Sequence, residues 1–412
     1  MKALWRSPTL RSVAAYGASG VAFAGANIIL ARVLPTAQYG LFTLVMALVN
    51  LGSAVAPLGL DGIVNRRRLE AGPGLFGRTL AVGSAVGVLF LGIAQLGYGL
   101  DASMLIVVFI ATVGGGAMWV AGAQFQSEQR YGISLALTQS PNVLLLLTAS
   151  ALMLSRVRNA WLPLFIFALG YVLAAAYGWR VLLRERKAKP YRGSSFPMSE
   201  ALSFAGLNVV GMVLLQLDRL VIPYVLTMHD LATFGVLAAI AGSLFRVLSL
   251  GVGYTLLPRL RAAQSVVQQR RLIAHEAKLI GAIVVGGAAM VLLVTPLIER
   301  WFLAGKYHLA TSLVLAAIVS GVAKVAGSFA KSTVSALGTP SELSLVNLLG
   351  WASVAIGIWA AAIGAHWGLA GVMLGVGLGW LIRALVAFYL TMRHLKLPAG
   401  VPATSSLSSH VP

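Results

Sequence analysis

The sequence predicts an all-α polytopic membrane protein with about twelve transmembrane helices in two six-helix lobes. Of its 412 residues, 58% are hydrophobic and 10% are charged, a balance that would leave a water-soluble fold short of polar surface. Apolar stretches of about 20 residues, long enough to cross a hydrocarbon layer of roughly 30 Å, recur from residue 13 to residue 392. The sequence shows no run of segments of about 10 residues with alternating hydrophobicity, the pattern of a membrane β-barrel. The solvent for most of the chain is therefore lipid.

Short polar links separate the apolar stretches into twelve expected spans. These spans are 13–34, 41–63, 79–99, 103–123, 134–154, 161–182, 201–227, 232–256, 278–298, 309–330, 342–363 and 367–391. The first span follows Lys2, Arg6 and Arg11, as the apolar core of a cleaved secretion signal would. Its apolar run exceeds the roughly 7 to 15 residues of such a core, so we expect it to remain as the first helix.

Basic residues gather on one side of the expected spans. The net charge is +20, but the basic residues are scattered between apolar spans, which indicates a topology signal and no nucleic-acid partner. One side collects Lys2, Arg6, Arg11, Arg66, Arg67, Arg68, Arg78, Arg130, Arg184, Arg186, Lys187, Lys189, Arg192, Arg259, Arg261, Arg270, Arg271, Lys278, Arg393 and Lys396. The other collects Arg32, Arg156, Arg158, Arg300 and Lys306. The positive-inside rule makes the first side cytoplasmic, and an even number of spans places both termini there.

A polar link at about residues 183–200 divides the chain into two halves. We expect an N-terminal six-helix lobe over residues 1–190, a C-terminal six-helix lobe over 191–396 and a disordered cytoplasmic tail over 397–412. A short pattern repeats at the outer ends of the halves, where Val33-Leu34-Pro35 leads to Tyr39-Gly40-Leu41 and Val225-Leu226-Thr227 leads to Phe234-Gly235-Val236. Six spans return the chain to the same side, so an axis along the membrane normal would relate the halves, with a cavity between them.

Several of these motifs resemble a known family. They are Leu30-Ala31-Arg32-Val33-Leu34-Pro35, Tyr39-Gly40-Leu41-Phe42, Leu58-Gly59-Leu60-Asp61-Gly62, Asn65-Arg66-Arg67, Gln216-Leu217-Asp218-Arg219-Leu220 and Phe234-Gly235-Val236. Together they resemble the Wzx-like polysaccharide biosynthesis proteins, the oligosaccharide flippases of the multidrug/oligosaccharidyl-lipid/polysaccharide (MOP) exporter superfamily, which also contains the MATE transporters. The specific motifs occupy a small part of the chain, whereas the layout of spans resembles the family over most of it.

The resemblance implies a function and a location. Such a protein would move a polyprenyl-diphosphate-linked oligosaccharide across the bacterial inner membrane for the assembly of O-antigen, capsule or exopolysaccharide. It would meet this lipid-linked substrate, membrane lipids and the polysaccharide polymerase machinery as partners. Some relatives have fourteen spans, so a chain with twelve is a poorer match to the peptidoglycan-precursor branch.

Ionisable residues at membrane depth occur in the second half of the chain. They are Asp218, Arg219, Arg246, Lys324, Lys331 and Arg383. A charge at mid-bilayer costs roughly 2.5 to 3.5 kcal/mol on insertion scales, so each is expected to face a wet cavity or a partner. Arg246, in the middle of its span, is the strongest candidate for a cavity residue, and an interhelical ion pair is the alternative. Asp218 and Arg219 point about 100° apart on a helix, so we expect separate partners for them.

One face of the tenth span is polar. Ser320, Lys324, Ser328 and Lys331 recur at offsets of four, four and three, which places them on one side of a helix. A cationic wall that attracts a lipid-linked diphosphate is one interpretation. In the other, Lys331 extends to the inner interface and Lys324 pairs with a backbone carbonyl.

Asp218 and Asp61 are the acids nearest to membrane depth, and a transporter coupled to H+ or Na+ needs a titratable group of this kind. Asp61, near the inner end of its span, fits an interfacial cap better. For Asp218, the sequence favours ion coupling and structural pairing equally. Pro57, Pro141 and Pro223 interrupt or bend spans at places where helices could move.

These residues predict a transporter, not an enzyme. Two halves would alternate access to a central cavity in which Arg246, Arg219, Lys324 and Arg383 offset diphosphate charge. A MATE-like drug or cation antiporter is the first alternative, although an acidic cavity would then be expected and the 11 acids lie mostly in loops. A membrane-embedded polysaccharide polymerase or glycosyltransferase is the second, although the outer links are short. The chain has no Cys, and its 6 His are spread along it, so no metal or other cofactor is predicted.

Overall fold

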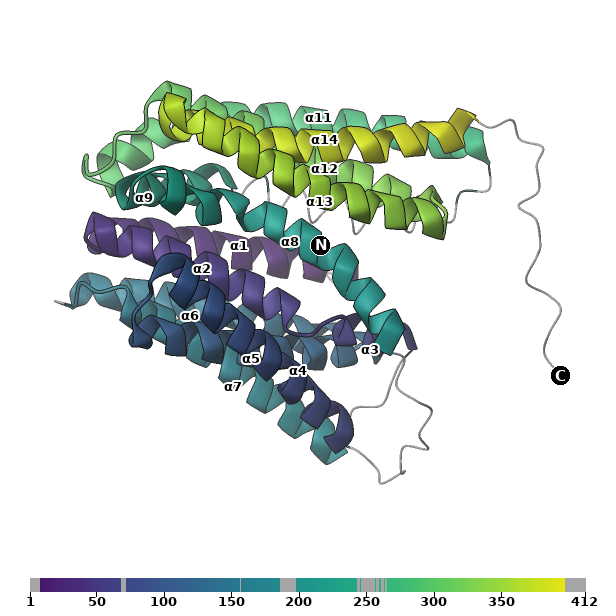
Figure 1. Ribbon diagram of the computed structural model, residues 1–412, viewed down its shortest axis with the longest axis horizontal. Coiled ribbons are helices and arrows are strands. Elements are labelled where there is room, and N and C mark those ends of the chain that lie inside the picture. The colour runs from purple at the N-terminus through teal and green to yellow at the C-terminus, as the bar shows by residue number, and fades with distance from the viewer. Residues whose placement is uncertain are drawn as a thin grey trace.

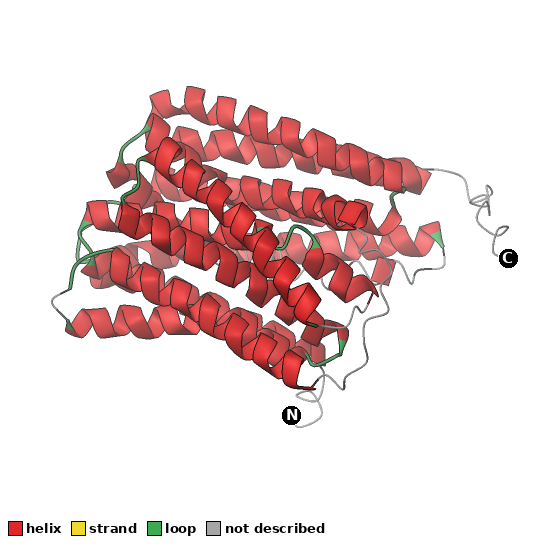
Figure 2. Ribbon diagram, turned by 60° about the horizontal axis from the view of Figure 1, so that its bottom comes forward, coloured by secondary structure: helices red, strands yellow, loops and turns green. Residues whose placement is uncertain are grey.

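The computed structural model describes residues 8–67, 72–155, 157–185, 198–242 and 265–396, together with Phe245, Leu256, Arg259, Leu260 and Ala263. Within these ranges the protein is almost entirely helical and contains no strand (Figure 2). The helices run between two ends of the bundle, where short loops connect them.

The described residues of the first half form seven α-helices. They are α1 (Pro8–Val33), α2 (Thr36–Val55), α3 (Leu60–Arg67), α4 (Pro73–Gly92) with a π-helical continuation over Ile93–Gly97, α5 (Ala102–Ser127), α6 (Tyr131–Leu154) and α7 (Trp161–Glu185). The described elements of the second half are α8 (Met198–Val225), α9 (Met228–Leu237) continued by Ala238–Gly242, α11 (Val266–Leu297) continued by Ile298–Phe302, α12 (Thr311–Leu337), α13 (Pro340–Gly364) and α14 (Gly368–Lys396).

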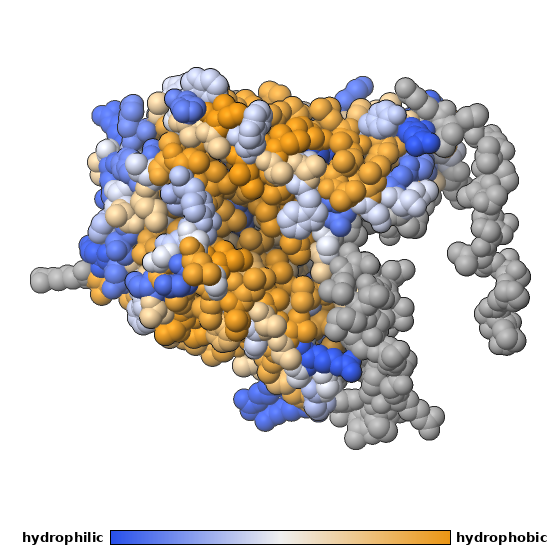
Figure 3. All heavy atoms as spheres, viewed as in Figure 1, coloured by the Kyte–Doolittle hydropathy of each residue, from blue (hydrophilic) through white to orange (hydrophobic). Residues whose placement is uncertain are grey.

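Every expected span except the second falls on one of these helices, although the eighth, 232–256, is described continuously only as far as Gly242. Eight described helices are long and apolar enough to cross a membrane. The surface shows a broad apolar band between two polar ends of the bundle (Figure 3), as a surrounding bilayer requires. The prediction of an all-α polytopic membrane protein is confirmed.

The second expected span, 41–63, is wrong in one respect, because it is broken. α2 ends at Val55 and α3 begins at Leu60, with Pro57 in the turn between them. Leu58 and Gly59 have φ angles of 43° and 81° there. A Cβ at Gly59 would also collide with the carbonyl oxygen of Ala201 in α8. Glycine is therefore required at this point both for the turn and for the approach of α8.

The helices of each half pack mainly among themselves. In the first half α1 packs on α6, and α5 packs on α2, α4 and α7, while in the second half α14 packs on α12 and α13. The two groups form separate layers in Figure 1, and they meet where α2 contacts α8 and α9 and where α1 contacts α9. The boundary expected at residues 190 and 191 and the tail expected over 397–412 lie outside the described residues and stay predictions.

The repeated sequence pattern lies at the contact between the halves. A Cβ on Gly40 of α2 would collide with the carbonyl oxygen of Met228 at the start of α9. In return, a Cβ on Gly235 of α9 would lie 2.5 Å from the Thr43 Oγ1 and 3.1 Å from the Tyr39 ring, both on α2. Each motif thus supplies the glycine that lets the other helix approach, as small residues do between membrane helices.

Candidate functional site

Asp218 and Lys324 form an ion pair between α8 and α12. Lys324 Nζ lies 2.7 Å from Asp218 Oδ2, and the two side chains are 20% and 1% exposed, respectively. The second carboxylate oxygen of Asp218 is buried and has no hydrogen-bond partner among the described residues. In the alternative interpretation Lys324 pairs with a backbone carbonyl, whereas in the structure its partner is a buried carboxylate on the facing helix.

Arg219 has a different partner from its neighbour. Its Nη1 donates a hydrogen bond of 2.9 Å to the Oε1 of Gln216, one turn earlier on α8. Gln216 is itself buried. Asp218 and Arg219 thus have separate partners, as the angle between adjacent helical positions predicted.

Arg383 of α14 is buried inside the second half, with 4% of its surface exposed. Its guanidinium extends between α8 and α13. A Cβ atom placed on Gly211 of α8 would lie 3.5 Å from Nη1, and one placed on Gly350 of α13 would lie 3.9 Å from Nε. The Arg383 Cζ lies 5.9 Å from the centroid of the Trp380 ring. Trp380 is fixed in turn, because its Nε1 donates to the carbonyl oxygen of Leu214 in α8 at 3.2 Å. The Nε of Arg383 has no hydrogen-bond partner in the described part of the chain.

Lys331 lies two turns after Lys324 on α12 and is half-buried. Arg383 lies on the neighbouring part of α14, since Ala330 and Ala384, the residues next to the two cations, belong to one apolar cluster. Neither cation has an acidic partner among the residues that the structure describes. The structure therefore divides the predicted cations into a neutralised pair, Asp218 with Lys324, and an uncompensated pair, Lys331 with Arg383.

One predicted site residue in the described part of the chain is not brought to these pairs. Asp61 lies in the first turn of α3, where its carboxylate accepts hydrogen bonds from backbone groups of its own turn, including that of Gly62. This placement fits the interfacial cap that the sequence favoured. Arg246, the strongest cavity candidate from the sequence, lies outside the described residues, so its role stays a prediction.

A polar contact that the sequence did not predict joins the halves at the end that holds the α1–α2 and α8–α9 links. Lys306, in the loop before α12, donates from Nζ to the carbonyl oxygens of Ala31, at 2.8 Å, and of Leu34. Ala31 lies in the last turn of α1 and Leu34 directly follows the helix, at the end where carbonyls lack partners within the helix and the dipole is negative. Burial lowers the pKa of the Lys306 ammonium below its ordinary value. The isolated position of Lys306 on the sparsely charged side was the one sequence signal for this role.

We call this contact region the outer seam, after the orientation that the basic residues predict. It comprises Lys306 together with Gly40, Thr43, Met228 and Gly235 at the α2–α9 crossing. Tyr39 and Tyr307 are both buried beside it and pack edge to face, with ring centroids 6.3 Å apart. Backbone contact, aromatic packing and a helix cap together close this end of the bundle.

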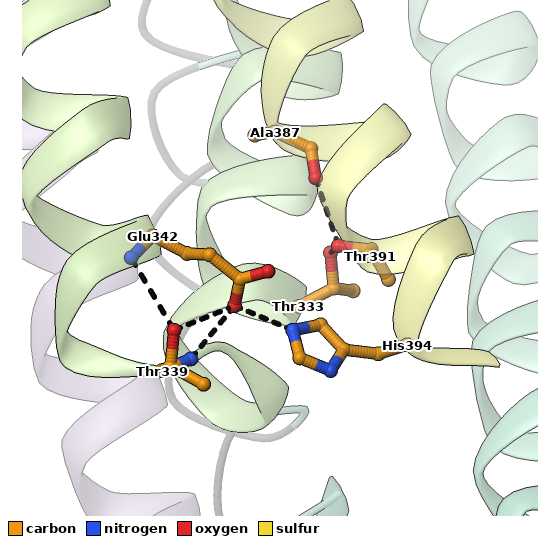
Figure 4. Close-up of polar contacts among 6 residues, drawn as sticks. All are labelled: Thr333, Thr339, Glu342, Ala387, Thr391 and His394. Carbon is orange, nitrogen blue, oxygen red and sulfur yellow. Dashed lines mark hydrogen bonds and ion pairs between the residues drawn. The ribbon is translucent and has the colours of Figure 1, made fainter. Parts of the chain in front are cut away.

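At the opposite end, α13 is tied to α14 by one carboxylate. Glu342 Oε2 accepts hydrogen bonds from the Thr339 backbone N–H at 2.8 Å and from its hydroxyl at 3.0 Å, which forms a capping box at the start of α13 (Figure 4). The same oxygen lies 2.5 Å from the Nε2 of His394, near the end of α14. Close by, the hydroxyls of Thr333 and Thr391 share a hydrogen bond of 3.0 Å between α12 and α14.

Comparison with solved structures identifies the fold. An inward-facing multidrug resistance MATE family transporter of the MOP superfamily matches with a TM-score of 0.65 and 14% identity, over 92% of this chain and 94% of that chain. The lipid II flippase MurJ in an inward closed conformation matches with a TM-score of 0.66 and 12% identity, over 92% of this chain and 87% of that chain. The chain has the fold of these transporters. An outward-facing MATE transporter matches with a lower TM-score of 0.56, at 14% identity over 95% and 97% of the two chains.

No protein-family model and no curated protein matches the sequence. The expected MATE-like fold is confirmed by the structural matches. Membership in the MOP superfamily and in its oligosaccharide flippase branch stays a prediction, because identities of 12% to 15% establish the fold alone.

Proposed function

We propose that this protein is a flippase for a polyprenyl-diphosphate-linked oligosaccharide in the bacterial inner membrane. The observation that carries the proposal is the excess of positive charge at membrane depth in α8, α12 and α14. Among the described residues at this depth, one acid, Asp218, is accompanied by four cations: Arg219, Lys324, Lys331 and Arg383. Cations at this depth are costly unless a partner or an anionic ligand compensates them. A diphosphate headgroup supplies that charge, while its polyprenyl tail stays in the lipid.

The side-chain chemistry suits this headgroup. A guanidinium binds phosphate oxygens through paired hydrogen bonds and stays protonated, and an ammonium adds a compact positive charge. The closed outer seam, together with the higher TM-scores against inward-facing and inward closed structures, supports an inward-facing state. In this proposal the end with His394 and Glu342 faces the cytoplasm, both termini lie on that side, and polymerase machinery uses the product on the other side.

Asp218 gives the proposal a means of coupling to H+. In the observed pair its carboxylate binds the ammonium group of Lys324. Protonation of Asp218 would release the ammonium to a substrate phosphate, so that a proton and an anion would bind together. Coupling to Na+ is the other form of this proposal, with Asp218 as the ligand.

A MATE-like exporter of cationic drugs is the alternative, and the shared fold supports it equally. The chemistry of α8 and α12 favours the flippase. A cationic substrate needs an unpaired acid, whereas the buried acid here already binds Lys324. Under this alternative, Asp218 would exchange Lys324 for the drug.

The test is transport by purified protein in proteoliposomes. One sample contains a fluorescent polyprenyl-diphosphate oligosaccharide, and a matched sample contains a fluorescent organic cation. We expect movement of the lipid between leaflets and no uptake of the cation. Lys324→Ala and Arg246→Ala should slow flipping at least tenfold, whereas Arg393→Gln, an exposed cation near the end of α14, should leave it unchanged.

Transport of the organic cation without lipid flipping would establish the alternative. In the source bacterium, a deletion strain should accumulate the lipid-linked oligosaccharide in the cytoplasmic leaflet. Normal distribution of that lipid between leaflets in the deletion strain would refute the flippase proposal.

A further inference from the structure

A groove opens to the outside of the bundle between α6 and α7, in the first half of the chain. It has a volume of about 710 Å³ and is lined by residues of α6 from Gly132 to Leu147 and by Gly170, Leu173 and Ala174 of α7. Leu147 and Leu173 are exposed on its open side. Fifteen residue steps on α6 correspond to roughly 22 Å, more than the roughly 15 Å of hydrocarbon in one bilayer leaflet. The groove is therefore long enough for a whole acyl chain.

The wall of this groove is apolar, although two polar residues contribute to it. The Ser140 hydroxyl donates to the carbonyl oxygen of Leu137 at 3.0 Å, within its own helix. The Gln139 amide donates from Nε2 to the Thr138 hydroxyl oxygen at 3.2 Å, also on α6. The other lining residues are apolar or glycine. Since the polar groups bond within α6, the groove suits a hydrocarbon chain better than a polar solute.

Contacts between α6 and α7 show which part of α7 lies level with the Gly132 end of the groove. A Cβ on Gly178 would lie 3.0 Å from the Cδ1 of Leu137. Arg130, directly before α6, forms an ion pair with Glu185, the last residue of α7. The two helices therefore run antiparallel, and the last two turns of α7 lie beside the beginning of α6, where the groove starts.

Two arginines lie in these last turns of α7. Arg180 and Arg184 follow Leu173, which lines the groove, at offsets that place all three on one face of the helix. Both arginines are exposed, and neither has an acidic partner among the residues that the structure describes. Tyr177 is exposed on the same face, and tyrosine is enriched where membrane meets water. Positive charge with free donors thus lies at one end of an apolar groove.

We infer that the α6–α7 groove binds an anionic phospholipid of the membrane. One acyl chain lies along the groove from Gly132 toward Leu147, and Arg180 and Arg184 bind the phosphate through charge-assisted hydrogen bonds. An apolar helix of another chain could also cover the groove, but it would leave the two arginines without a counter-charge. The site lies apart from the charged residues of α8, α12 and α14 and does not depend on the transported substrate. A lipid that packs against both helices should stabilise the folded protein.

The experiment measures lipid binding to the purified full chain in detergent, by native mass spectrometry and by the shift of the thermal unfolding midpoint. The probes are dioleoylphosphatidylglycerol and dioleoylphosphatidylcholine, which share their acyl chains and differ in net charge. Soluble glycerol 3-phosphate is the probe for a headgroup without a chain. Phosphatidylglycerol should bind saturably, raise the midpoint and bind about tenfold more tightly than phosphatidylcholine, because its negative charge is not compensated within the headgroup. Glycerol 3-phosphate should not bind.

The charge is tested by the double variant Arg180→Gln with Arg184→Gln. It should weaken phosphatidylglycerol binding about tenfold and leave phosphatidylcholine binding unchanged, because only the phosphate contacts are lost. Arg271→Gln with Lys278→Gln is the matched control, since it removes two exposed cations from α11. This control should bind both lipids like the unmodified protein.

The groove is tested by Ala136→Trp, which fills it from an exposed position on α6. This variant should lose saturable phosphatidylglycerol binding although both arginines are present. Ala151→Trp places the same side chain at an exposed position of α6 outside the groove and should bind like the unmodified protein. Surface substitutions of this kind have small effects on stability, so both variants should fold.

Unchanged phosphatidylglycerol affinity in the double arginine variant or in Ala136→Trp would overturn the site. Equal affinity for the two lipids would also overturn it, because charge would then have no role, and so would binding of glycerol 3-phosphate, because the groove would then have none. A dimer of the lipid-free protein that Ala136→Trp dissociates would assign the groove to a second copy of this chain instead. None of these measurements involves transport, so failure of the lipid site would leave the proposed function untouched.

Discussion

Asp218 and Lys324 face each other across α8 and α12 with 2.7 Å between the carboxylate oxygen and the ammonium nitrogen. The acid is buried, and the lysine is largely so. Removing one partner of a buried pair leaves the other charge uncompensated, whereas replacing both with apolar or neutral groups does not. This asymmetry lets a structural role be separated from a role in coupling.

Asp218→Asn should lower the free energy of unfolding by about 3 kcal/mol, because Lys324 is left without its counter-ion. Lys324→Met should cost a similar amount. The double variant should be less destabilised than the sum of the two, and thermal unfolding of the four proteins in detergent measures the difference. Simple additivity would contradict the ion pair.

The same double variant tests coupling to H+. If Asp218 only stabilises the structure, the double variant should fold and respond to a pH gradient in proteoliposomes as the unmodified protein does. If Asp218 couples transport to H+, the folded double variant should lose this response. Flipping rates with and without an imposed gradient distinguish the two roles.

Lys306→Met should increase the fraction of molecules in which the outer seam is open, because the carbonyls at the end of α1 lose their cap. The chain contains no cysteine, so Thr43→Cys supplies a single reactive thiol at the buried α2–α9 crossing. Labelling of this thiol by a membrane-impermeant maleimide should rise several-fold in the Lys306→Met background. Lys306→Arg, which keeps the donors, serves as the control, and equal labelling in all three proteins would exclude the cap.

The lowered pKa of Lys306 gives this seam a pH dependence with a definite sign. When the seam opens, Lys306 reaches water and its pKa returns to about 10.4. The open form therefore binds the proton more tightly than the closed form, whose pKa is lowered by burial. Raising the pH through the window between these two values should favour the closed seam and reduce labelling of the Thr43→Cys thiol, after correction for its own reactivity. The Lys306→Met protein should not show this decrease.

Thr43→Cys combined with Gly235→Cys should form a disulfide across the outer seam. The Cβ built on Gly235 lies 2.5 Å and 3.3 Å from the Oγ1 and Cγ2 of Thr43, so the two Cβ atoms fall within the usual reach of a disulfide. Cross-linking should hold α2 against α9 and abolish transport, and a reducing agent should restore it. The single variants cannot form this disulfide, so reductant should not change their transport, and full transport by the cross-linked protein would refute the proposal that the seam must open.

Glu342→Ala should destabilise the protein by about 1 to 2 kcal/mol, because it removes the capping box of α13 and the contact with His394. Glu342→Gln keeps an acceptor for the backbone and should cost less. The separation of α13 and α14 can be followed with paired spin labels near residues 339 and 394. If both variants leave stability and separation unchanged, the observed contact contributes nothing to the packing of these helices.

The sequence predicted the helices well because each span is specified by its own composition. A stretch of about 20 apolar residues must cross the bilayer as a helix, whatever lies next to it. Pro57 marked an interruption in the sequence, but the approach of Ala201 to Gly59 at that turn was not predictable, because it depends on the packing of α8. The glycine pattern around Gly40 and Gly235 was visible, but its meaning as a reciprocal contact was not.

The sequence by itself determined that this is a helical membrane protein, where its spans lie and which residues carry charge at membrane depth, because hydropathy and ionisation are properties of each segment alone. The tertiary structure decided which of these charges are compensated. It joined Lys324 to Asp218, left Lys331 and Arg383 together without a described counter-ion, and placed Lys306 on the end of α1. The residues in each of these groups lie more than 50 positions apart in the sequence, and only the packing of distant helices can bring them close together.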